Sequence, residues 1–276
     1  MFEEIANGAG PQGATLYVPK GTLNLYNQAN VWKDFGHIID PATCTISYTA
    51  SEKLPGYEGS LDVGKTTFGP AIISHTFSNG TGTITCAGEI TQIGNISPAY
   101  SQEPFRACSD LKSITIPNSV TTIGFCAFCE SGLTSIEIPD SVTSIGELAF
   151  EGCTGLTSPI INSTLLVYVP ASYEGEYEIP DGIKTICGGA FIDANLSSIR
   201  IGESVKTIED FAFDNSKISE LHLNNKRPES LRLAESAFAS LENCTLFVPV
   251  GAGYRFRFDY RFKIFKEITN IIGNNK

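Results

Sequence analysis

Eight cysteines are the most reactive side chains of this sequence, and two of them, Cys126 and Cys129, form its one Cys-x-x-Cys pair. Two thiolates at this spacing can hold a metal ion, but a structural zinc site has four protein ligands and the three histidines lie far apart. The pattern therefore predicts free thiols packed in the core, with no metal site and no cofactor. A single disulfide stays open, because Cys129 could approach either Cys108 or Cys153.

The nucleotide-binding and nucleophile motifs are weak. Residues 8–13 (GAGPQG) match G-x-G-x-x-G, but a dinucleotide site needs a strand before this loop and a helix after it. Here a strand pattern follows, starting at Thr15. The sequence contains no G-x-S-x-G, and no histidine lies in a context that would activate a serine or cysteine nucleophile.

Two pairs of acids have the residue types of a glycosidase, Glu176 with Glu178 and Glu209 with Asp210. The strands and turns of repeat proteins expose acids routinely, so a solvated face explains these pairs better. The sequence therefore predicts a protein that is not an enzyme.

The elements that would position these residues belong to an internal repeat. The segment that begins at Leu111 matches the one that begins at Leu133 at nearly every apolar position. With each leucine counted as position 0, apolar residues occupy positions 3, 5, 9 and 12, proline position 6, glycine position 13, and an Ala-Phe pair positions 16 and 17. The same frame recurs around Phe191, Phe213 and Phe238, and a first copy runs from Ile84 to Phe105.

Each unit has the pattern of two short strands and a turn. Positions 2 to 5 alternate between polar and apolar residues, which predicts a half-buried strand, and the proline ends that strand. Positions 9 to 12 predict a second short strand, and the Ala-Phe pair predicts a tight turn that places the ring in the core. One unit cannot bury its apolar face alone, so the units must stack into a solenoid.

The pattern LxxIxIPxSVTxIGxxAFxxC resembles the BspA-like leucine-rich repeats of bacterial surface proteins, over about residues 80 to 245. The resemblance implies an α/β, β-rich solenoid, a right-handed leucine-rich-repeat superhelix of about six units of roughly 22–23 residues with a C-terminal cap. It also implies a secreted or surface-displayed protein that adheres to, or binds, proteins or glycans.

A second similarity joins the two ends of the chain. Residues 14–19 (ATLYVP) match residues 244–249 (CTLFVP), and an aromatic-rich stretch follows both. We expect residues 1–40 to resemble the cap of a preceding repeat array, residues 41–80 to form strands that lead into the solenoid, residues 81–244 to form the repeats, and residues 245–276 to form the C-terminal cap. An equally open alternative is that residues 1–40 cap the N-terminal side of this solenoid.

The segment from Leu165 to Gly182 departs from the plain repeat and is interpreted as an expanded turn. Its three tyrosines, Tyr168, Tyr173 and Tyr177, are a candidate surface for glycan stacking or partner docking. The favoured alternative is that they pack against their own repeat.

The best candidate for binding is the outward face of the first strands, because stacking brings positions 2 and 4 of each unit onto one contiguous sheet face. An equally weighted alternative is that these polar residues only keep the face soluble. The candidate residues are Ser113, Thr115, Ser135, Glu137, Glu176, Glu178, Ser198, Arg200, Glu220 and His222.

Charge limits the partners. The net charge of −11 disfavours nucleic acid and anionic lipid, and no apolar run is long enough to span a membrane. The first residues form no secretory signal, so the sequence belongs to a cytoplasmic protein or begins after a removed leader. Together with the resemblance, these features predict a monomeric secreted or cell-surface binding module for an extracellular protein or glycan. The alternative function is that of a structural spacer in a larger surface protein.

Overall fold

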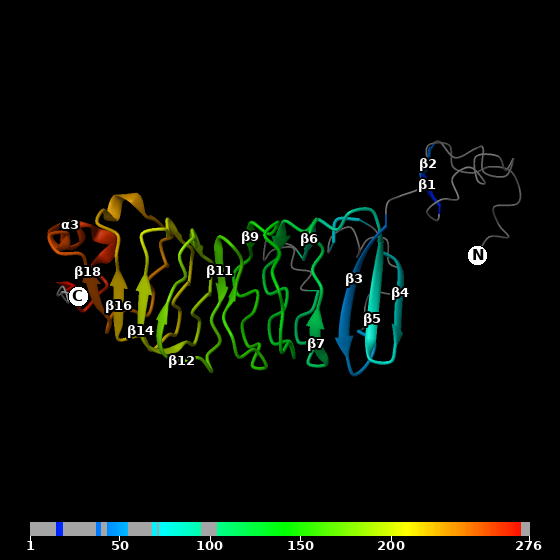
Figure 1. Ribbon diagram of the computed structural model, residues 1–276, viewed down its shortest axis with the longest axis horizontal. Coiled ribbons are helices and arrows are strands. Elements are labelled where there is room, and N and C mark those ends of the chain that lie inside the picture. The colour runs from blue at the N-terminus through cyan, green and yellow to red at the C-terminus, as the bar shows by residue number, and fades with distance from the viewer. Residues whose placement is uncertain are drawn as a thin grey trace, which may run out of the picture.

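The computed structural model describes residues 15–18, 37–39, 43–54, 68–70, 72–94 and 104–271. Successive turns of the chain stack side by side along one long axis, with their strands lying across it (Figure 1). The fold is a β-solenoid of about seven turns with little helix, which confirms the predicted leucine-rich-repeat architecture. Helix α3 (Gly253–Phe258) lies at the C-terminal end. The described part of the chain contains no helix with the length and hydropathy needed to cross a bilayer.

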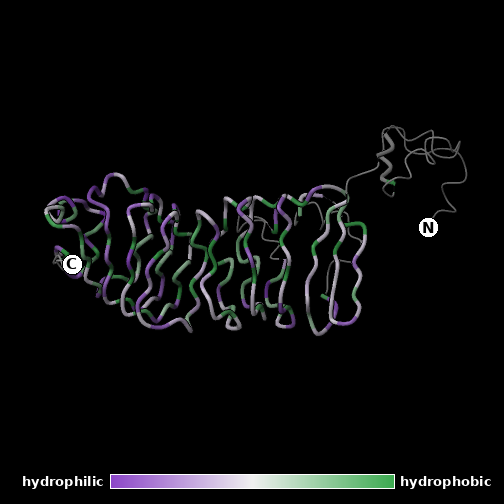
Figure 2. The backbone as a smooth tube through the Cα atoms, viewed as in Figure 1, coloured by the Kyte–Doolittle hydropathy of each residue, from purple (hydrophilic) through white to green (hydrophobic). Residues whose placement is uncertain are grey.

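The first strands of the later units form a parallel five-stranded sheet. Its strands, in spatial order, are β12 (Glu174–Glu178), β14 (Asn195–Ile201), β16 (Glu220–Leu223), β18 (Thr245–Val248) and β19 (Glu267–Asn270). The same unit position is paired from strand to strand, so Ile199, Leu221 and Leu246 stack in one fully buried column. Hydrophobic residues recur in this way in every turn along the solenoid (Figure 2).

The second strands form two further sheets. One is the parallel sheet β6 (Gln92–Ile93), β8 (Thr122–Ile123) and β9 (Ser144–Ile145). The other contains β10 (Ile160–Ile161), β11 (Leu165–Tyr168), β13 (Thr185–Ile186), β15 (Thr207–Ile208) and β17 (Arg232–Leu233). These strands are short because each unit turns sharply after position 12.

The N-terminal end of the solenoid is an antiparallel sheet in the order β4 (Ile72–Ser78), β5 (Thr81–Ala87), β3 (Thr43–Ala50) and β7 (Leu111–Ile114). The repeat frame predicts that the strand at Ile84 pairs with the next unit at Leu111, but β3 lies between them. Asn79 and Gly80 both have positive φ, 51° and 76°, and connect β4 and β5 in a tight hairpin, while β3 pairs with the other edge of β5. A Cβ at Gly82 would lie 1.9 Å from Cζ of Tyr48, so glycine lets β3 pack closely.

In most turns of the solenoid one phenylalanine ring fills the core. Phe105, Phe128 and Phe150 stack with ring centroids 5.3 and 5.1 Å apart. A second stack starts at Phe191 and reaches Phe213 at 5.1 Å. Such offset stacks stabilise a solenoid because every ring contacts the rings of both neighbouring units.

The two ring stacks are separated by one contracted unit. Val169 takes the place of the phenylalanine there, since its N–H donates to Ala190 O at 2.7 Å as Phe128 N–H donates to Ala149 O at 2.8 Å. Five residue steps separate Ile186 of β13 from Phe191, whereas three separate its partner Leu166 from Val169.

The prediction of an expanded turn from Leu165 to Gly182 is therefore wrong. Leu165–Tyr168 is strand β11 of the contracted unit, and all four of its residues are buried. Tyr168 and Tyr177 are 5% and 7% exposed, and the ring of Tyr177 meets that of Phe191 edge-on at 6.0 Å. Burial raises the pKa of both phenols to about 12. These tyrosines pack against their own repeats, as the favoured alternative held, and Tyr173 packs edge-on against Tyr177 at 5.5 Å.

The two similar end segments share one strand register. Strand β1 (Thr15–Tyr17) pairs in parallel with β2 (His37–Ile39), with Thr15 opposite His37. Strand β18 pairs in parallel with β19, with Thr245 opposite Glu267, which is the same pairing in the matching segment. The loop of residues 8–13 and the aromatic-rich stretch between β1 and β2 lie outside the described residues.

Candidate binding surface

The predicted polar columns come together on the five-stranded sheet. Backbone pairing places Glu176 beside Ser198 and Ser198 beside Glu220 in the first column. The same pairing joins the residues of the second column, which are Glu178, Arg200 and His222. Both columns continue into the cap, through Thr245 and Phe247.

The other four candidates lie elsewhere, so the prediction of a single contiguous sheet face is wrong. Ser113 is in β7 of the antiparallel sheet, where its hydroxyl hydrogen-bonds to that of Thr49 at 2.7 Å. Ser135 and Glu137 are in a segment without assigned strand, and Thr115 faces them across a groove of about 500 Å³. At this groove Thr134 N–H donates to Lys112 O at 3.0 Å, but the first strands of the two units pair no further, although their second strands, β8 and β9, do pair.

Two of the candidates are buried rather than exposed. Ser198 is 5% and His222 9% exposed, whereas Glu176, Glu178 and Glu220 are open to solvent. The Ser198 hydroxyl has no hydrogen-bond partner among the residues that the structure describes. A buried polar atom without a partner is uncommon.

His222 is held by its neighbours in one orientation. Its ring stacks on Phe247 at 4.5 Å with 7° between the planes. Arg200 Nη1 lies 3.4 Å from Nδ1, and Nε2 lies 3.2 Å from Glu220 Oε2. The guanidinium can only donate, so Nδ1 accepts and Nε2 carries the proton that is donated to Glu220. The sheet thus presents a fixed Arg–His–Glu row beside an aromatic ring.

A hollow of about 520 Å³ adjoins this row. Glu178 and Arg200 line it, together with acids and a lysine from the following loops and the exposed Val250. The loop residues with charge are Asp181, Glu203 and Lys226. Charges of both signs around an apolar patch suit a ligand with both donors and acceptors.

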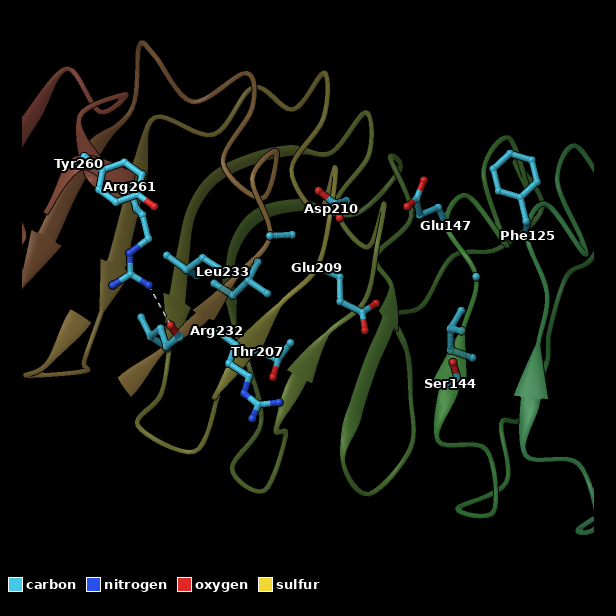
Figure 3. A pocket seen from close by; sticks show the side chains of 15 residues that line it. Phe125, Ser144, Glu147, Thr207, Glu209, Asp210, Arg232, Leu233, Tyr260 and Arg261 are labelled. Atoms are coloured by element: carbon cyan, nitrogen blue, oxygen red, sulfur yellow. Dashed lines mark hydrogen bonds between the residues drawn. The ribbon is translucent and has the colours of Figure 1, made fainter. Parts of the chain in front are cut away.

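A larger hollow of about 720 Å³ lies over the second strands. Its carboxylates, Glu147, Glu209 and Asp210, lie between Phe125 at one end and Tyr260 with Arg261 at the other (Figure 3). Burial raises the pKa of Glu209, and nearby Asp210 and Glu147 raise it further, although the Gly188 N–H donates to its carboxylate at 3.0 Å. Sequence reasoning placed Glu209 on a solvated face and missed Glu147.

The contracted unit explains why Glu147 lies close to Glu209 and Asp210. Because that unit lacks two residues of its turn, units on either side of it meet, and a Cβ at Gly188 would lie 3.0 Å from Cγ of Glu147. When the repeats are aligned, the contracted unit has a gap of two residues between Leu166 and Val169. This gap is the sequence signal that could have revealed the proximity of Glu147 and Glu209.

The cysteines are free thiols, six of them buried, with Cys44 and Cys108 half-buried. Cys153 lies beside Ser131, with Sγ and Oγ 3.4 Å apart, so Ser131 rather than Cys129 lies in the column between Cys108 and Cys153. Cys129 instead lies with Cys126 and with Glu151 of the next unit. The expectation that Cys129 lines that column is wrong, because the turn directs it to the other side.

Three solved structures show partial likeness to this chain. A leucine-rich repeat protein from Eubacterium ventriosum is 27% identical with a TM-score of 0.40, and the alignment covers 54% of this chain and 45% of that one. A leucine rich cell surface protein from Faecalibacterium prausnitzii is 22% identical (TM-score 0.36; 64% and 46% covered). A leucine-rich repeat protein from Bacteroides ovatus is 19% identical (TM-score 0.29; 71% and 67% covered). The chain thus spans less than half the length of the first two.

The repeat family gives the decisive comparison. No curated protein matches the chain. The BspA type Leucine rich repeat region, in six copies, matches residues 98–177 and 171–250, which together are more than half of the sequence. The matched residues include the two strands, the proline and the Ala-Phe turn that build the solenoid. The chain therefore belongs to the BspA-type leucine-rich repeat family.

Proposed function

We propose that this chain is a non-catalytic binding module displayed on a bacterial surface, and that it recognises an extracellular protein or glycan through the polar face of the sheet β12–β14–β16–β18. The observation that carries the proposal is the fixed Arg200–His222–Glu220 row on Phe247, beside the hollow at Glu178. The cell-surface relative from Faecalibacterium prausnitzii is in keeping with this location.

The physical argument rests on preorganisation. The row is held by the sheet, by ring stacking and by its own hydrogen bonds, so little side-chain entropy is lost when a ligand binds. Glu176, Glu178 and Glu220 stay exposed as acceptors, and Arg200 is half-exposed as a donor. Aromatic and arginine side chains in a partly desolvated setting are common energetic centres of interfaces.

An array of glycans and extracellular-matrix proteins, probed with the purified chain, tests this proposal. We expect one specific class of ligand to bind, and the triple variant Glu176→Ala, Glu178→Ala, Arg200→Ala to lose at least about 2 kcal/mol of binding free energy, as loss of a central charged residue does. The variant should melt within a few degrees of the parent, because none of the three side chains is buried.

The matched control carries Glu130→Ala, Lys217→Ala and Glu242→Ala, which removes the same charges from exposed turns. It should bind as the parent does. Equal binding by parent and triple variant would show that the ligand uses another surface, and a loss of binding in the control would point to net charge rather than to the sheet face.

A second candidate function, a spacer in a tandem surface protein, is supported by the shared register of β1–β2 and β18–β19. In the C-terminal cap, β18 pairs with β16 of the last repeat on its other edge. If β1 is the equivalent strand, it pairs with a repeat strand placed before it, and amide hydrogen exchange at Thr15–Tyr17 would detect this pairing.

A further inference from the structure

The turn of the unit that begins at Leu111 carries two buried thiols. Cys126 and Cys129 occupy positions 15 and 18 of the unit and are 4% and 2% exposed. Cys126 has a positive φ of 47°, as Leu148 at the same position of the next unit has, at 59°. The repeat therefore imposes the shape of this turn, and the thiols are an addition to it.

A carboxylate from the next unit completes the group. Glu151 is at position 18 one unit later, and its Oε2 lies 3.6 Å from Sγ of Cys129. The ligand atoms of Cys126, Cys129 and Glu151 all lie within 4.8 Å of one another. No other group of His, Cys, Asp or Glu that could hold a metal ion occurs among the described residues.

We propose that Cys126, Cys129 and Glu151 bind one divalent cation of borderline softness, of the class of Zn²⁺. Zinc–sulfur bonds of about 2.3 Å in a tetrahedron place neighbouring ligand atoms roughly 3.5–3.8 Å apart. The distance between Cys129 Sγ and Glu151 Oε2 already has this value. The half-exposed side of Glu151 leaves the fourth position to water, as in zinc sites with three protein ligands.

Binding of a divalent cation at this group requires both thiols to lose their protons. Burial raises the pKa of the Cys129 thiol, and Cys126 and Glu151 raise it further, while Arg106 lowers it. A bound divalent ion reverses this balance, because it stabilises both thiolates and releases their two protons to solvent. The complex of two thiolates and one carboxylate then has one net negative charge, and the guanidinium of Arg106 offsets it.

Titration of the reduced chain with Cd²⁺ in the absence of oxygen tests the site. We expect one Cd²⁺ per chain, a thiolate-to-metal absorption band in the ultraviolet, two protons released per ion and a higher melting temperature. Cys129→Ser should abolish the absorption band of the pair. Glu151→Gln, which keeps the shape of a half-exposed side chain, should weaken the affinity by at least about tenfold.

Cys108→Ser is the matched control, because it removes a half-buried thiol of the neighbouring turn and should leave the titration unchanged. Melting of each variant without metal checks that it folds. Equal Cd²⁺ binding in Cys129→Ser and parent would overturn the proposal. So would a chain that, after purification in air, carries a Cys126–Cys129 disulfide and binds no Cd²⁺ once reduced, since the pair would then be a redox couple.

Discussion

The carboxylate of Glu209 lies in the hollow of Figure 3, half-buried and close to two other acids. Desolvation is the main cause of its raised pKa, and the hydrogen bond from Gly188 N–H only partly offsets it. A raised pKa in an acid means that the folded chain holds the proton more tightly than the unfolded chain does. Its contribution to stability is therefore complete below the usual glutamate pKa and is lost as pH rises through the higher folded value.

Glu209→Gln removes the ionisable group, so the variant does not lose stability at neutral pH through ionisation of a half-buried carboxyl. Because the glutamine amide oxygen can still accept from Gly188, we expect the variant to melt above the parent at pH 7, and the difference to vanish as pH falls toward the pKa of free glutamate. Thermal melts over a pH series measure the effect. The exposed Glu203→Gln serves as control, and a variant that melts below the parent at pH 7 would mean that the charged form is the stabilising one.

Single positions could be predicted from the sequence wherever the repeat sets their environment. The pairing of Glu178 with Arg200 and of Arg200 with His222 followed from unit positions alone. The burial of Ser198 and His222 did not, because it depends on which large neighbours, such as Phe247, cover them. The proximity of Cys129 to Glu151 likewise depends on the turn between them.

Among the elements, the contracted unit depends on one side chain. Asn162 is 9% exposed, and its amide nitrogen donates to Pro139 O and Val142 O at 3.2 and 3.0 Å. Its Oδ1 accepts from the N–H groups of Thr164 and Leu165 at 3.0 and 2.8 Å. The side chain thus supplies partners for four backbone groups where the chain turns from β10 into β11.

Asn162→Ala removes all four hydrogen bonds, although Pro139 O still accepts from Val142 N–H at 3.0 Å. We expect it to lower the free energy of unfolding by about 2–4 kcal/mol, since buried unpaired polar groups are costly. Urea denaturation followed by circular dichroism measures the change, and Asn195→Ala, at an exposed asparagine, should be nearly neutral. A loss below about 0.5 kcal/mol would show that water or backbone movement replaces the four bonds.

Elements that follow the repeat were predictable, and elements that interrupt it were not. The strands at Ile123, Ile145, Ile186 and Ile208 lie where the apolar period places them. The insertion of β3 between β5 and β7 is a long-range pairing that the repeat pattern does not encode. The contracted unit was misread because its tyrosines resemble an exposed loop in composition while they fill the core.

At the scale of the whole molecule, the core divides into two clusters that meet at the contracted unit. One contains Phe105, Phe128 and Phe150, and the other contains Phe191 and Phe213. In a solenoid each turn contacts mainly its neighbours, so stability is close to a sum of local terms.

A chain with residues 81–243 repeated ahead of residue 14 tests the tandem arrangement. There β1 should pair with the last strand of the added array, as β18 pairs with β16. Hydrogen exchange at Thr15–Tyr17 should slow by at least about tenfold, which corresponds to about 1.4 kcal/mol of protection. Unchanged exchange at these amides would argue against the spacer function and leave the binding module unaffected.

The direction of the strands also determines how this molecule would respond to mechanical load. The hydrogen bonds that join one turn to the next run along the long axis, because the strands lie across it (Figure 1). Tension between the two ends therefore opens these bonds one row at a time, as in unzipping, instead of loading all rows together, as in shear. Each turn that unfolds adds the contour length of its residues. Under force the solenoid would therefore extend in steps, one turn at a time, before the connection between its two ends fails.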